Sequence, residues 1–425
     1  MGRLGTTGGQ ARERSPGLTA PGPTRVAMID VADPLSDLDC TRDGAPPYEG
    51  AWILACRAGR PLGIVELPLH DTWIRAAELE QELRSELGKA WSRELPADAP
   101  QLVRASVVIP TALSRPDQLR RCVRRLTELD HPDYEVIVVD NRPADAPPVE
   151  IAGARVMRER RPGISAARNR GLAAATGEIV AFTDDDVEVD RRWLRALGER
   201  FARQPELAAV TGLVVPAELE TPAQIWFERS GSGPDRGFSA LTFERAGAYR
   251  VARRAHDDGS ERVHSLYATG ELGLGSNMAF STEVLRAMGG FDVALGTGTP
   301  ARGGEDLAIL LELLSAGHQL GYEPSAIVHH THRATLAELR QQIYGYGVGF
   351  TAMLTAIALR DPRHLAGLAA VAPAWVRSLR DPASPKRAQR TDDYPSGLER
   401  AEMRGMLAGP FAYLRSRRMQ RKWAP

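Results

Sequence analysis

Three short apolar runs predict buried β-strands in the first half of the chain. They are SVVIP at residues 106–110, EVIVVD at 135–140 and EIVAF at 178–182. Apolar, β-branched runs of this length are typical of strands that are covered on both faces. Apolar residues at helical spacing lie between them, as in Leu119–Leu126 and the alanine-rich run Ala166–Ala175. A strand, helix, strand order favours parallel pairing, so we expect an α/β fold with a mostly parallel, Rossmann-like sheet flanked by helices.

The rest of the chain divides around this domain. Residues 1–25 are rich in Gly, Pro, Thr and Arg and hold no apolar segment, so we expect disorder there. Residues 26–100 predict a small α/β accessory module and a linker. The main domain is expected over residues 103–333, and residues 334–425 predict a helical C-terminal extension. Within the main domain, residues 217–270 contain several glycines and a proline and are expected to be rich in loops.

Length and composition set the broad class. With 425 residues and 43% hydrophobic positions, the chain can bury a large core and more than one domain. The basic and acidic residues are balanced at 54 each, which argues against a nucleic-acid partner. The three cysteines show no zinc or redox spacing, so a reducing, cytoplasmic location is expected.

An acidic triplet, Asp184–Asp186, follows the third predicted strand directly. Adjacent carboxylates repel one another, and a hard divalent cation offsets that cost. Mg²⁺ or Mn²⁺ is usually held by one or two carboxylates together with substrate phosphates. A solvated turn that ends the strand explains the triplet equally well by itself. Thr111 and Asp140 end the other two strands, and ligands of open α/β sheets bind at such ends, which favours a pocket.

Three further sites carry candidate chemistry. Arg168 lies in the first turns of a predicted helix, where phosphate is favoured, although pairing with a surface acid is the plain alternative. Glu305 and Asp306 open an apolar helix, and from local sequence alone they are explained by capping. The segment VHHTH at residues 328–332 brings three histidines together, and neutral imidazole is a Mn²⁺ ligand; surface histidines are the alternative.

In this order, the motifs SVVIPT, EVIVVDN, RPGISAARNRG, EIVAFTDDD, GLGSNMAF and GGEDLA resemble glycosyltransferase family 2 over Arg104–Arg333. The resemblance implies a GT-A fold and a nucleotide-sugar donor. It also implies roles, with nucleotide-sugar-binding residues Pro110, Thr111, Asp140, Arg168, Asp184 and Asp185, metal ligands Asp184, Asp186 and His330, and catalytic residues Asp306 and Glu305. Among these, Asp184 and Asp186 match the metal-binding Asp-x-Asp, and Asp306 is the candidate base.

The resemblance implies a metal-dependent, inverting, non-processive transfer. The cation, Mn²⁺ or Mg²⁺, offsets the charge of the departing diphosphate, and Asp306 accepts the proton of the acceptor hydroxyl. A UDP-sugar is the favoured donor, and the acceptor is a glycan, a lipid-linked molecule or a small molecule. Two alternatives stay open, a nucleotide-sugar-binding module without turnover and a membrane-attached transferase with a lipid-linked acceptor. Residues 339–344 read LRQQIY, without the Gln-x-x-Arg-Trp motif of processive members, and no glycine-rich, lysine-bearing nucleotidyltransferase loop follows SVVIP.

The C-terminal extension bears on location. Residues 343–359 carry no charge but include three glycines, and the run is short for a membrane span. Pro373 interrupts the next apolar stretch, so packing helices are expected, with peripheral membrane contact as the alternative. The basic residues within 415–422 are interpreted as a solvated tail.

Overall fold

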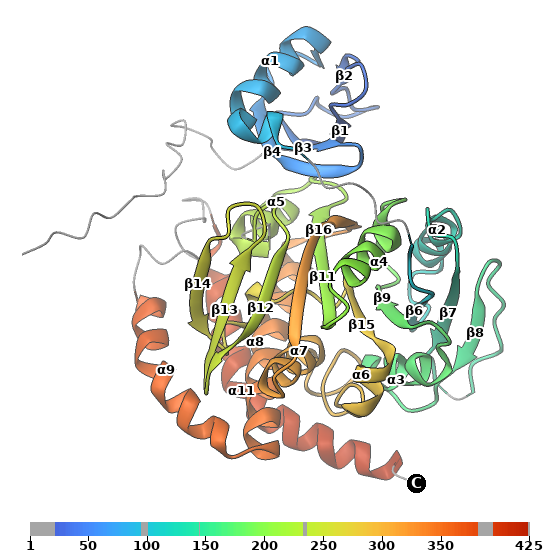
Figure 1. Cartoon of the computed structure of the whole chain (residues 1–425), viewed down its shortest axis with the longest axis vertical. Helices are drawn as coiled ribbons and strands as arrows, with labels where there is room; N and C mark the ends of the chain where they lie inside the picture. Colours follow the sequence, from blue (N-terminus) through green and yellow to red (C-terminus); the bar gives the residue numbers. More distant parts are fainter. Residues whose placement is uncertain (1–21, 95–100, 144, 233–235, 381–393, 424–425) are drawn as a thin grey trace, which may run out of the picture.

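The structure is a computed structural model that describes residues 22–94, 101–143, 145–232, 236–380 and 394–423 (Figure 1). Most of the expected disordered start lies outside the described residues, as do residues 95–100 at the end of the expected module and linker. The expectation is wrong for the end of the first segment, because Thr24 and Arg25 begin strand β1 (Thr24–Asp30). They pair with Gly50 and Ala51 of β3 (Gly50–Arg57), which gives their backbone groups regular partners.

One large sheet forms the main domain. Its order is β14-β13-β12-β16-β11-β15-β9-β6-β7-β8, and β10 pairs with β16 beside this path. Parallel pairing joins β6 to β7, β6 to β9, β7 to β8 and β11 to β16. The strands outside the β12–β14 region are β6 (Ala105–Thr111), β7 (Tyr134–Asp140), β8 (Arg155–Arg158), β9 (Ile179–Phe182), β10 (Val187–Val189), β11 (Leu207–Pro216), β15 (Met278–Ser281) and β16 (Gln319–His330).

Helices cover both faces of this sheet. The covering helices are α2 (Pro116–Thr127), α3 (Ile164–Ala174), α4 (Trp193–Arg203), α6 (Thr282–Ala287) and α7 (Glu305–Ser315). Successive residues of β6 point to opposite faces, so Val107 and Ile109 pack with residues of α2 and α4, while Val108 packs with residues of α3. Two separate cores result, which confirms the predicted α/β class with a parallel-rich sheet between helices.

Strand register brings the predicted site residues to one edge. Thr111 and Asp140 are direct neighbours across β6 and β7. Strand β10 runs antiparallel to β16 with Val187 opposite His330, which carries the preceding residue, Asp186, next to the histidine segment. The acidic triplet is therefore held between β9 and β10 at the carboxyl edge of the parallel strands.

The expectation of loop for residues 217–270 is wrong over much of its length. This region forms α5 (Pro222–Phe227), a π-helical turn η2 (Glu228–Ser232), β12 (Leu241–Gly247), β13 (Arg250–Ala255), β14 (Glu261–Ser265) and a 3-10 turn η3 (Thr269–Glu271). The three strands extend the sheet beyond β16 in antiparallel fashion. Their sequences are rich in charged residues, because much of this extension faces solvent.

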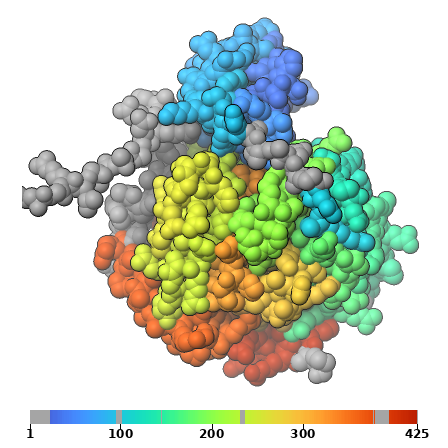
Figure 2. Space-filling view, in the orientation of Figure 1, coloured from blue at the N-terminus to red at the C-terminus, as the bar shows by residue number. Residues whose placement is uncertain are grey.

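The accessory module stands at one end of the molecule (Figures 1 and 2). Its elements are β1, β2 (Leu38–Asp39), β3 (Gly50–Arg57), β4 (Arg60–Pro68), β5 (Trp73–Ile74), α1 (Ala76–Leu87) and a 3-10 turn η1 (Gly88–Ser92). Trp52 and Leu54 of β3 share a buried cluster with Leu213 and Ile327 of the main sheet. A buried ion pair of 3.1 Å joins Arg60 to Glu199 of α4. The module is thus packed against the main domain through both apolar and charged contacts.

Long helices form the C-terminal extension, as predicted. They are α8 (Leu336–Arg360), α9 (Arg363–Arg380) and α11 (Ser396–Gln420), with a final turn η4 (Arg421–Trp423). Helix α8 and helix α11 cross closely, since a Cβ added to Gly347 would lie 2.2 Å from the Glu402 carbonyl oxygen, and one on Gly405 2.2 Å from that of Tyr344. Among the described residues, α8 is the one helix long and apolar enough to cross a membrane, and 39% of its most apolar window is buried in the protein. Residues 415–420 belong to α11 and do not form a free tail, whereas the basic side chains are exposed, as expected: Arg415, Arg417, Arg418, Arg421 and Lys422.

Candidate active site

The acidic triplet meets the end of β6 at the carboxyl edge of the sheet. Thr111 Oγ1 donates a 2.6 Å hydrogen bond to Asp185 Oδ2, and the Leu113 backbone N–H donates to the same hydroxyl. Pro110 lies in the buried core of β6 beside them. The apolar strand below and the threonine hydroxyl above therefore fix where the middle carboxylate of the triplet points.

Arg168 of α3 connects the triplet to the start of α7. Its side chain is 1% exposed, and it donates to Glu305 Oε1 at 2.7 Å, to Asp184 Oδ1 at 3.1 Å and to the Gly275 carbonyl oxygen at 3.1 Å. It also lies over the ring of Phe291, 5.6 Å from the centroid. A buried guanidinium with two carboxylate partners has little conformational freedom. Arg168 therefore holds the end of β9 and the start of α7 in a fixed relation.

The two acids that open α7 have different surroundings. Glu305 is 6% exposed and bonded to Arg168, whereas Asp306 is only partly buried. Asp306 Oδ2 accepts a 2.8 Å hydrogen bond from the Gly275 backbone N–H, and its Oδ1 accepts from that of Leu307. A solute entering from the edge of the sheet can therefore reach Asp306 more readily than Glu305.

Burial raises the pKa of two carboxyl groups here. It raises the pKa of Glu305 to about 7, with Asp306 adding to the rise and Arg168 opposing it. It raises the pKa of Asp184 to about 6, against the opposing charge of Arg168 and with support from the neighbouring acids. The pKa of Asp185 is also raised, first by burial. Each rise means that a nearby positive charge would stabilise the ionised form.

Asp186 faces the histidine segment at the end of β16. Its Oδ1 lies 3.9 Å from His330 Nε2, and its Oδ2 lies 2.5 Å from Arg115 Nη1 and 3.8 Å from Arg333 Nη2. Burial lowers the pKa of His330 to about 4, so its ring is neutral near pH 7, as a metal ligand must be. His332 contacts this ring, with the two Nδ1 atoms 3.3 Å apart. The Nε2 of His332 in turn lies 3.0 Å from Glu228 Oε2.

These side chains could hold a divalent cation only if a substrate or water supplied further ligands. Within the part of the chain that the structure describes, no three His, Cys, Asp or Glu side chains are grouped closely enough to hold an ion. Asp186 and His330 nevertheless offer one oxygen and one neutral nitrogen toward each other, and Mn²⁺ or Mg²⁺ often takes its remaining ligands from phosphates and water.

The charges of this edge also leave room for a cation. It holds five carboxylates against three guanidinium groups, namely Asp184, Asp185, Asp186, Glu305 and Asp306 against Arg115, Arg168 and Arg333. The formal surplus of two negative charges matches one divalent ion. We call these eight residues the acid-rich edge.

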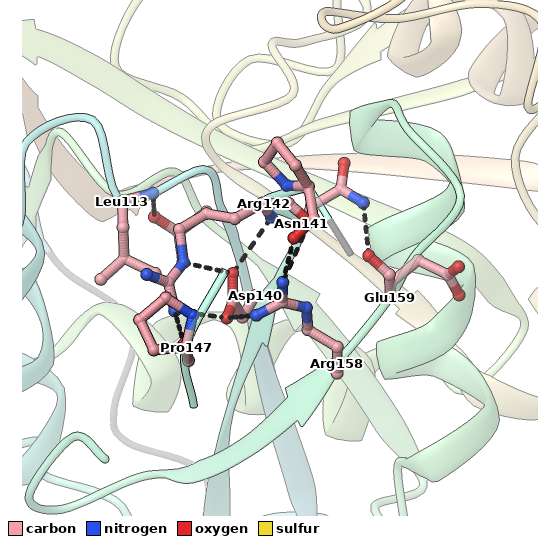
Figure 3. Close-up of polar contacts among 9 residues, drawn as sticks. Leu113, Asp140, Asn141, Arg142, Pro147, Arg158 and Glu159 are labelled. Atoms are coloured by element: carbon pink, nitrogen blue, oxygen red, sulfur yellow. Dashed lines mark hydrogen bonds and ion pairs between the residues drawn. The ribbon is translucent and has the colours of Figure 1, made fainter. Parts of the chain in front are cut away.

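Asp140, at the end of β7, has the opposite environment (Figure 3). Its Oδ1 accepts from the Arg142 backbone N–H and Nε, both at 3.0 Å, and its Oδ2 accepts from Arg142 Nη2 at 2.9 Å and Arg158 Nη1 at 2.5 Å. Burial alone would raise the pKa of Asp140, but the hydrogen bonds and charge of Arg142, with the charge of Arg158, lower it. One carboxylate thus holds two arginines, and we call this group the arginine clamp.

The structure gathers most residues that the sequence singled out, and their roles stay predictions. Asp140 touches the acid-rich edge only through its strand neighbour Thr111, and both its oxygens are already occupied. Sequence reasoning missed Arg115 and Arg333, which contact Asp186, and the arginines of the clamp. Their signal was weak, because an arginine after a strand is usually a surface residue.

Comparisons with known proteins show what this domain is similar to. A sequence model of glycosyl transferase family 2 matches residues 106–279. The pre-mycofactocin glycosyltransferase of Mycobacterium tuberculosis is 31% identical over 262 residues, which cover 59% of this chain and 48% of that protein. The glucosyl-dolichyl phosphate glucuronosyltransferase of Haloferax volcanii is 28% identical over 134 residues, 32% of this chain and 36% of that protein. The chain spans about half, or less, of the length of these curated relatives.

Among solved structures, the chain is similar to mannosyltransferase PcManGT from Pyrobaculum calidifontis in complex with GDP-Man and Mn²⁺. The match covers 77% of this chain and 93% of that one, at 18% identity and a TM-score of 0.45, which is too distant to carry an argument. The family match and the motifs along β6, β7 and β9 agree on the same domain. Residues 106–279 of this chain therefore match glycosyl transferase family 2.

Proposed function

We propose that the protein is a metal-dependent, inverting and non-processive glycosyltransferase. It would move a sugar from a nucleotide-diphosphate sugar to an acceptor hydroxyl. The observation that carries this proposal is the link between the acidic triplet and the start of α7. Arg168 bonds both Asp184 and Glu305, and Gly275 bonds both Arg168 and Asp306. A metal-diphosphate site and a general base would then lie on one rigid frame.

Asp186 and His330 are the side chains that would hold the metal, with Asp184 near the diphosphate. A bound divalent cation supplies Lewis-acid stabilisation of charge on the diphosphate, of the order of several kcal/mol. Arg168 and Arg115 keep the flanking carboxylates in place whether or not a ligand is present. Thr111 does the same for Asp185 through its hydroxyl.

Asp306 would accept the proton of the acceptor hydroxyl. Its Oδ2 is oriented by the Gly275 N–H, and its partial exposure lets an acceptor approach. Glu305 is buried against Arg168 and would position this pair instead of taking the proton. For inversion, the base must approach the anomeric carbon from the side opposite the diphosphate, which sets the orientation required of the donor.

Replacement of the base tests the proposal. The Asp306→Asn variant should keep binding of a UDP-sugar with Mn²⁺, while the transfer rate falls by ~10²–10⁴-fold. The donor is first found by screening nucleotide sugars, UDP-sugars foremost, for Mn²⁺-dependent thermal stabilisation, since a ligand of the folded state raises its stability. Transfer is then measured by release of the nucleoside diphosphate in the presence of candidate acceptors.

The matched control is Asp117→Asn, which alters an exposed acid of α2 paired only with surface Arg120. It should leave both binding and transfer unchanged. If the wild-type protein binds a donor but releases no diphosphate with any acceptor, and Asp306→Asn behaves identically, the protein is a binding module and the enzyme proposal fails.

A second candidate, a transferase attached to a membrane surface, is favoured by α11. Four apolar side chains, Met403, Leu407, Phe411 and Leu414, recur at helical spacing along it and are between 45% and 76% exposed. Arginines flank this stripe, at positions 400, 404, 415 and 418. An apolar stripe with basic neighbours is typical of helices that lie on anionic lipid. The dolichyl phosphate in the name of the Haloferax relative supports a test with lipid.

Flotation with vesicles that contain anionic phosphatidylglycerol tests this attachment. The protein should float with them, and the double variant Leu407→Gln and Phe411→Gln should remain in the soluble fraction. Met28→Gln, which replaces an exposed apolar residue of β1 far from α11 in sequence, is the control and should float. Equal flotation of all three proteins, or of none, would rule out the α11 surface as a lipid-binding face.

A further inference from the structure

A small pocket opens between the β13–β14 hairpin and the chain that leads into β12. It has a volume of about 260 Å³ and is lined by Arg236, Gly237, Arg253, Ala255, Ser260 and Arg262. This volume is below the ~300–1,000 Å³ of typical sites for drug-sized ligands, so a nucleotide sugar would not fit. None of these residues belongs to the acid-rich edge or the arginine clamp.

Arg236 is buried with unused hydrogen-bonding capacity. It is 7% exposed, and its Nη1 has no hydrogen-bond partner among the residues that the structure describes. Its guanidinium lies over the ring of Tyr322, 5.0 Å from the centroid, and Tyr322 donates its hydroxyl hydrogen to the Gly237 carbonyl oxygen at 3.1 Å. Tyr322 therefore contacts the guanidinium through its ring and also through its hydroxyl, while Nη1 stays without a partner among the described residues. A buried, charged donor without an acceptor is costly, so an anionic ligand would be stabilised at this position.

Two more arginines approach from the hairpin. Arg253 and Arg262 are paired directly across β13 and β14, and like charges in this position destabilise a sheet. Arg253 is held on the pocket side, because its Nη2 donates to the Arg236 carbonyl oxygen at 3.3 Å. Three guanidinium groups from three separate segments therefore line the same small space.

The acids near the pocket offset only part of this charge. Glu271 Oε2 lies 3.3 Å from Arg253 Nη1 and is shared with His264 at 3.8 Å. Asp258 is exposed and accepts a hydrogen bond from the Ser260 backbone N–H, and its charge also interacts with Arg262. Neither carboxylate bonds Arg236. Among the described residues, Arg253 is thus the pocket arginine with a carboxylate in direct contact, and buried Arg236 has no ion pair.

We propose that this pocket binds a phosphate group. A phosphate offers at least three acceptor oxygens and up to two negative charges, which suits donors that converge from three arginines, whereas one arginine already satisfies a carboxylate. The volume admits a phosphate or a diphosphate but not the donor of the proposed reaction. The site therefore goes beyond the proposed function and does not depend on it.

The pocket is connected to the candidate base through a short piece of chain. Glu271, the acid that contacts Arg253, precedes by four residues Gly275, whose N–H orients Asp306. Four residues span at most ~14 Å when fully extended. One short segment of chain therefore contacts both the pocket, through Glu271, and Asp306, through Gly275.

Titration calorimetry on the full-length protein tests the proposal with two probes, sodium phosphate and octyl phosphate, at constant ionic strength set by sodium chloride. Wild type should bind at least one of them. Arg236→Gln should weaken this affinity by about 10- to 100-fold, the usual value of a lost hydrogen bond to a charged group. Arg262 is more exposed, so Arg262→Gln should weaken the phosphate affinity by about fivefold. This variant tests the proposal if Arg236→Gln does not fold.

Arg254→Gln is the matched control, since Arg254 lies on the same hairpin but pairs with Glu244 and Glu261 away from the pocket. Binding of inorganic phosphate indicates a free anion as ligand, and binding of octyl phosphate alone indicates a phosphate head group on a larger molecule. Both results support the site. Absence of binding to wild type, or equal weakening in Arg254→Gln and Arg262→Gln, overturns it. UDP with Mn²⁺ serves as the reference, because its affinity should not change in these variants.

Discussion

The arginine clamp lies at the end of β7 and the acid-rich edge beyond the end of β9, on either side of β6, and the two groups are charged in opposite senses. The clamp sets one carboxylate between two arginines, while the acid-rich edge sets five carboxylates against three. Thr111 connects them, because it pairs with Asp140 across the sheet and donates its hydroxyl hydrogen to Asp185. A metal-diphosphate complex carries both signs of charge, so such a divided surface suits it. An acid at a strand end is therefore informative only when its partners are known.

Loss of Arg168 should have the largest effect, because it leaves the acid-rich edge with unpaired buried charge. We expect Arg168→Met to lower the free energy of unfolding by about 3–5 kcal/mol, the usual cost of breaking a buried ion pair. Urea denaturation followed by fluorescence measures it. Arg120→Met removes an exposed pair and should cost at most ~1 kcal/mol. A similar decrease in the free energy of unfolding for both variants would mean that the acid-rich edge is solvated and that Arg168 does not stabilise it.

Gly275 allows the geometry of the acid-rich edge to be changed without altering its charge. A Cβ at this position would lie 2.9 Å from Asp306 Oδ2 and 3.1 Å from Arg168 Nη2. We expect Gly275→Ala to lower the transfer rate by up to ~10²-fold through displacement of Asp306. Gly270→Ala is the control, because nothing lies within 4 Å of its added Cβ, and it should keep full activity. Unchanged transfer in Gly275→Ala would contradict the assignment of Asp306 as base.

The clamp should tolerate the loss of one arginine better than the edge tolerates the loss of Arg168. Arg158→Met leaves Asp140 with Arg142, so we expect a decrease of about 1–2 kcal/mol in the free energy of unfolding. Thermal or urea denaturation at pH 7 gives the value. A loss as large as that of Arg168→Met would show that the two regions do not differ in the way proposed.

The smallest effect is a pH dependence specific to the clamp. The folded-state pKa of Asp140 lies below its ordinary value of 3.8, so its stabilising contribution is present above that pH and is lost as pH falls through the folded pKa. The stability difference between wild type and the double variant Arg142→Met and Arg158→Met should therefore shrink below pH 4. Urea denaturation at pH values between 3 and 6 measures it. A difference that stays constant over this range would show that Asp140 is not paired as described.

Much of the central domain was predictable because its local patterns agree with its long-range packing. The apolar runs ending at Pro110, Asp140 and Phe182 became β6, β7 and β9, and the acidic triplet was correctly placed at their carboxyl edge. The partners of Asp186 were not predictable, because Arg115 and Arg333 reach it from positions 71 residues before and 147 residues after it in sequence.

The failures have a common physical cause, which is that tertiary contacts outweigh local preference. Strands β12–β14 were missed because charged residues dominate their exposed face and hide the buried residues, such as Leu241 and Phe243. Helix α8 continues through Gly345, Gly347 and Gly349, and Gly347 lets the backbone of α11 approach closely. Glycine weakens a helix in isolation, yet it is what allows two backbones to approach this closely.

Helix α8 also packs against the residues just before α7, so these two parts of the chain cannot be exchanged independently. Gly349 of α8 abuts Gly303 and Gly304, immediately before Glu305, and a Cβ on Gly304 would lie 2.4 Å from the Gly349 carbonyl oxygen. Both the acids of α7 and the helix that braces them lie beyond residue 279, where the match to the family ends. A chimera that exchanges residues 106–279 alone would therefore separate the acidic triplet from Glu305 and Asp306, and from the helix that packs against them.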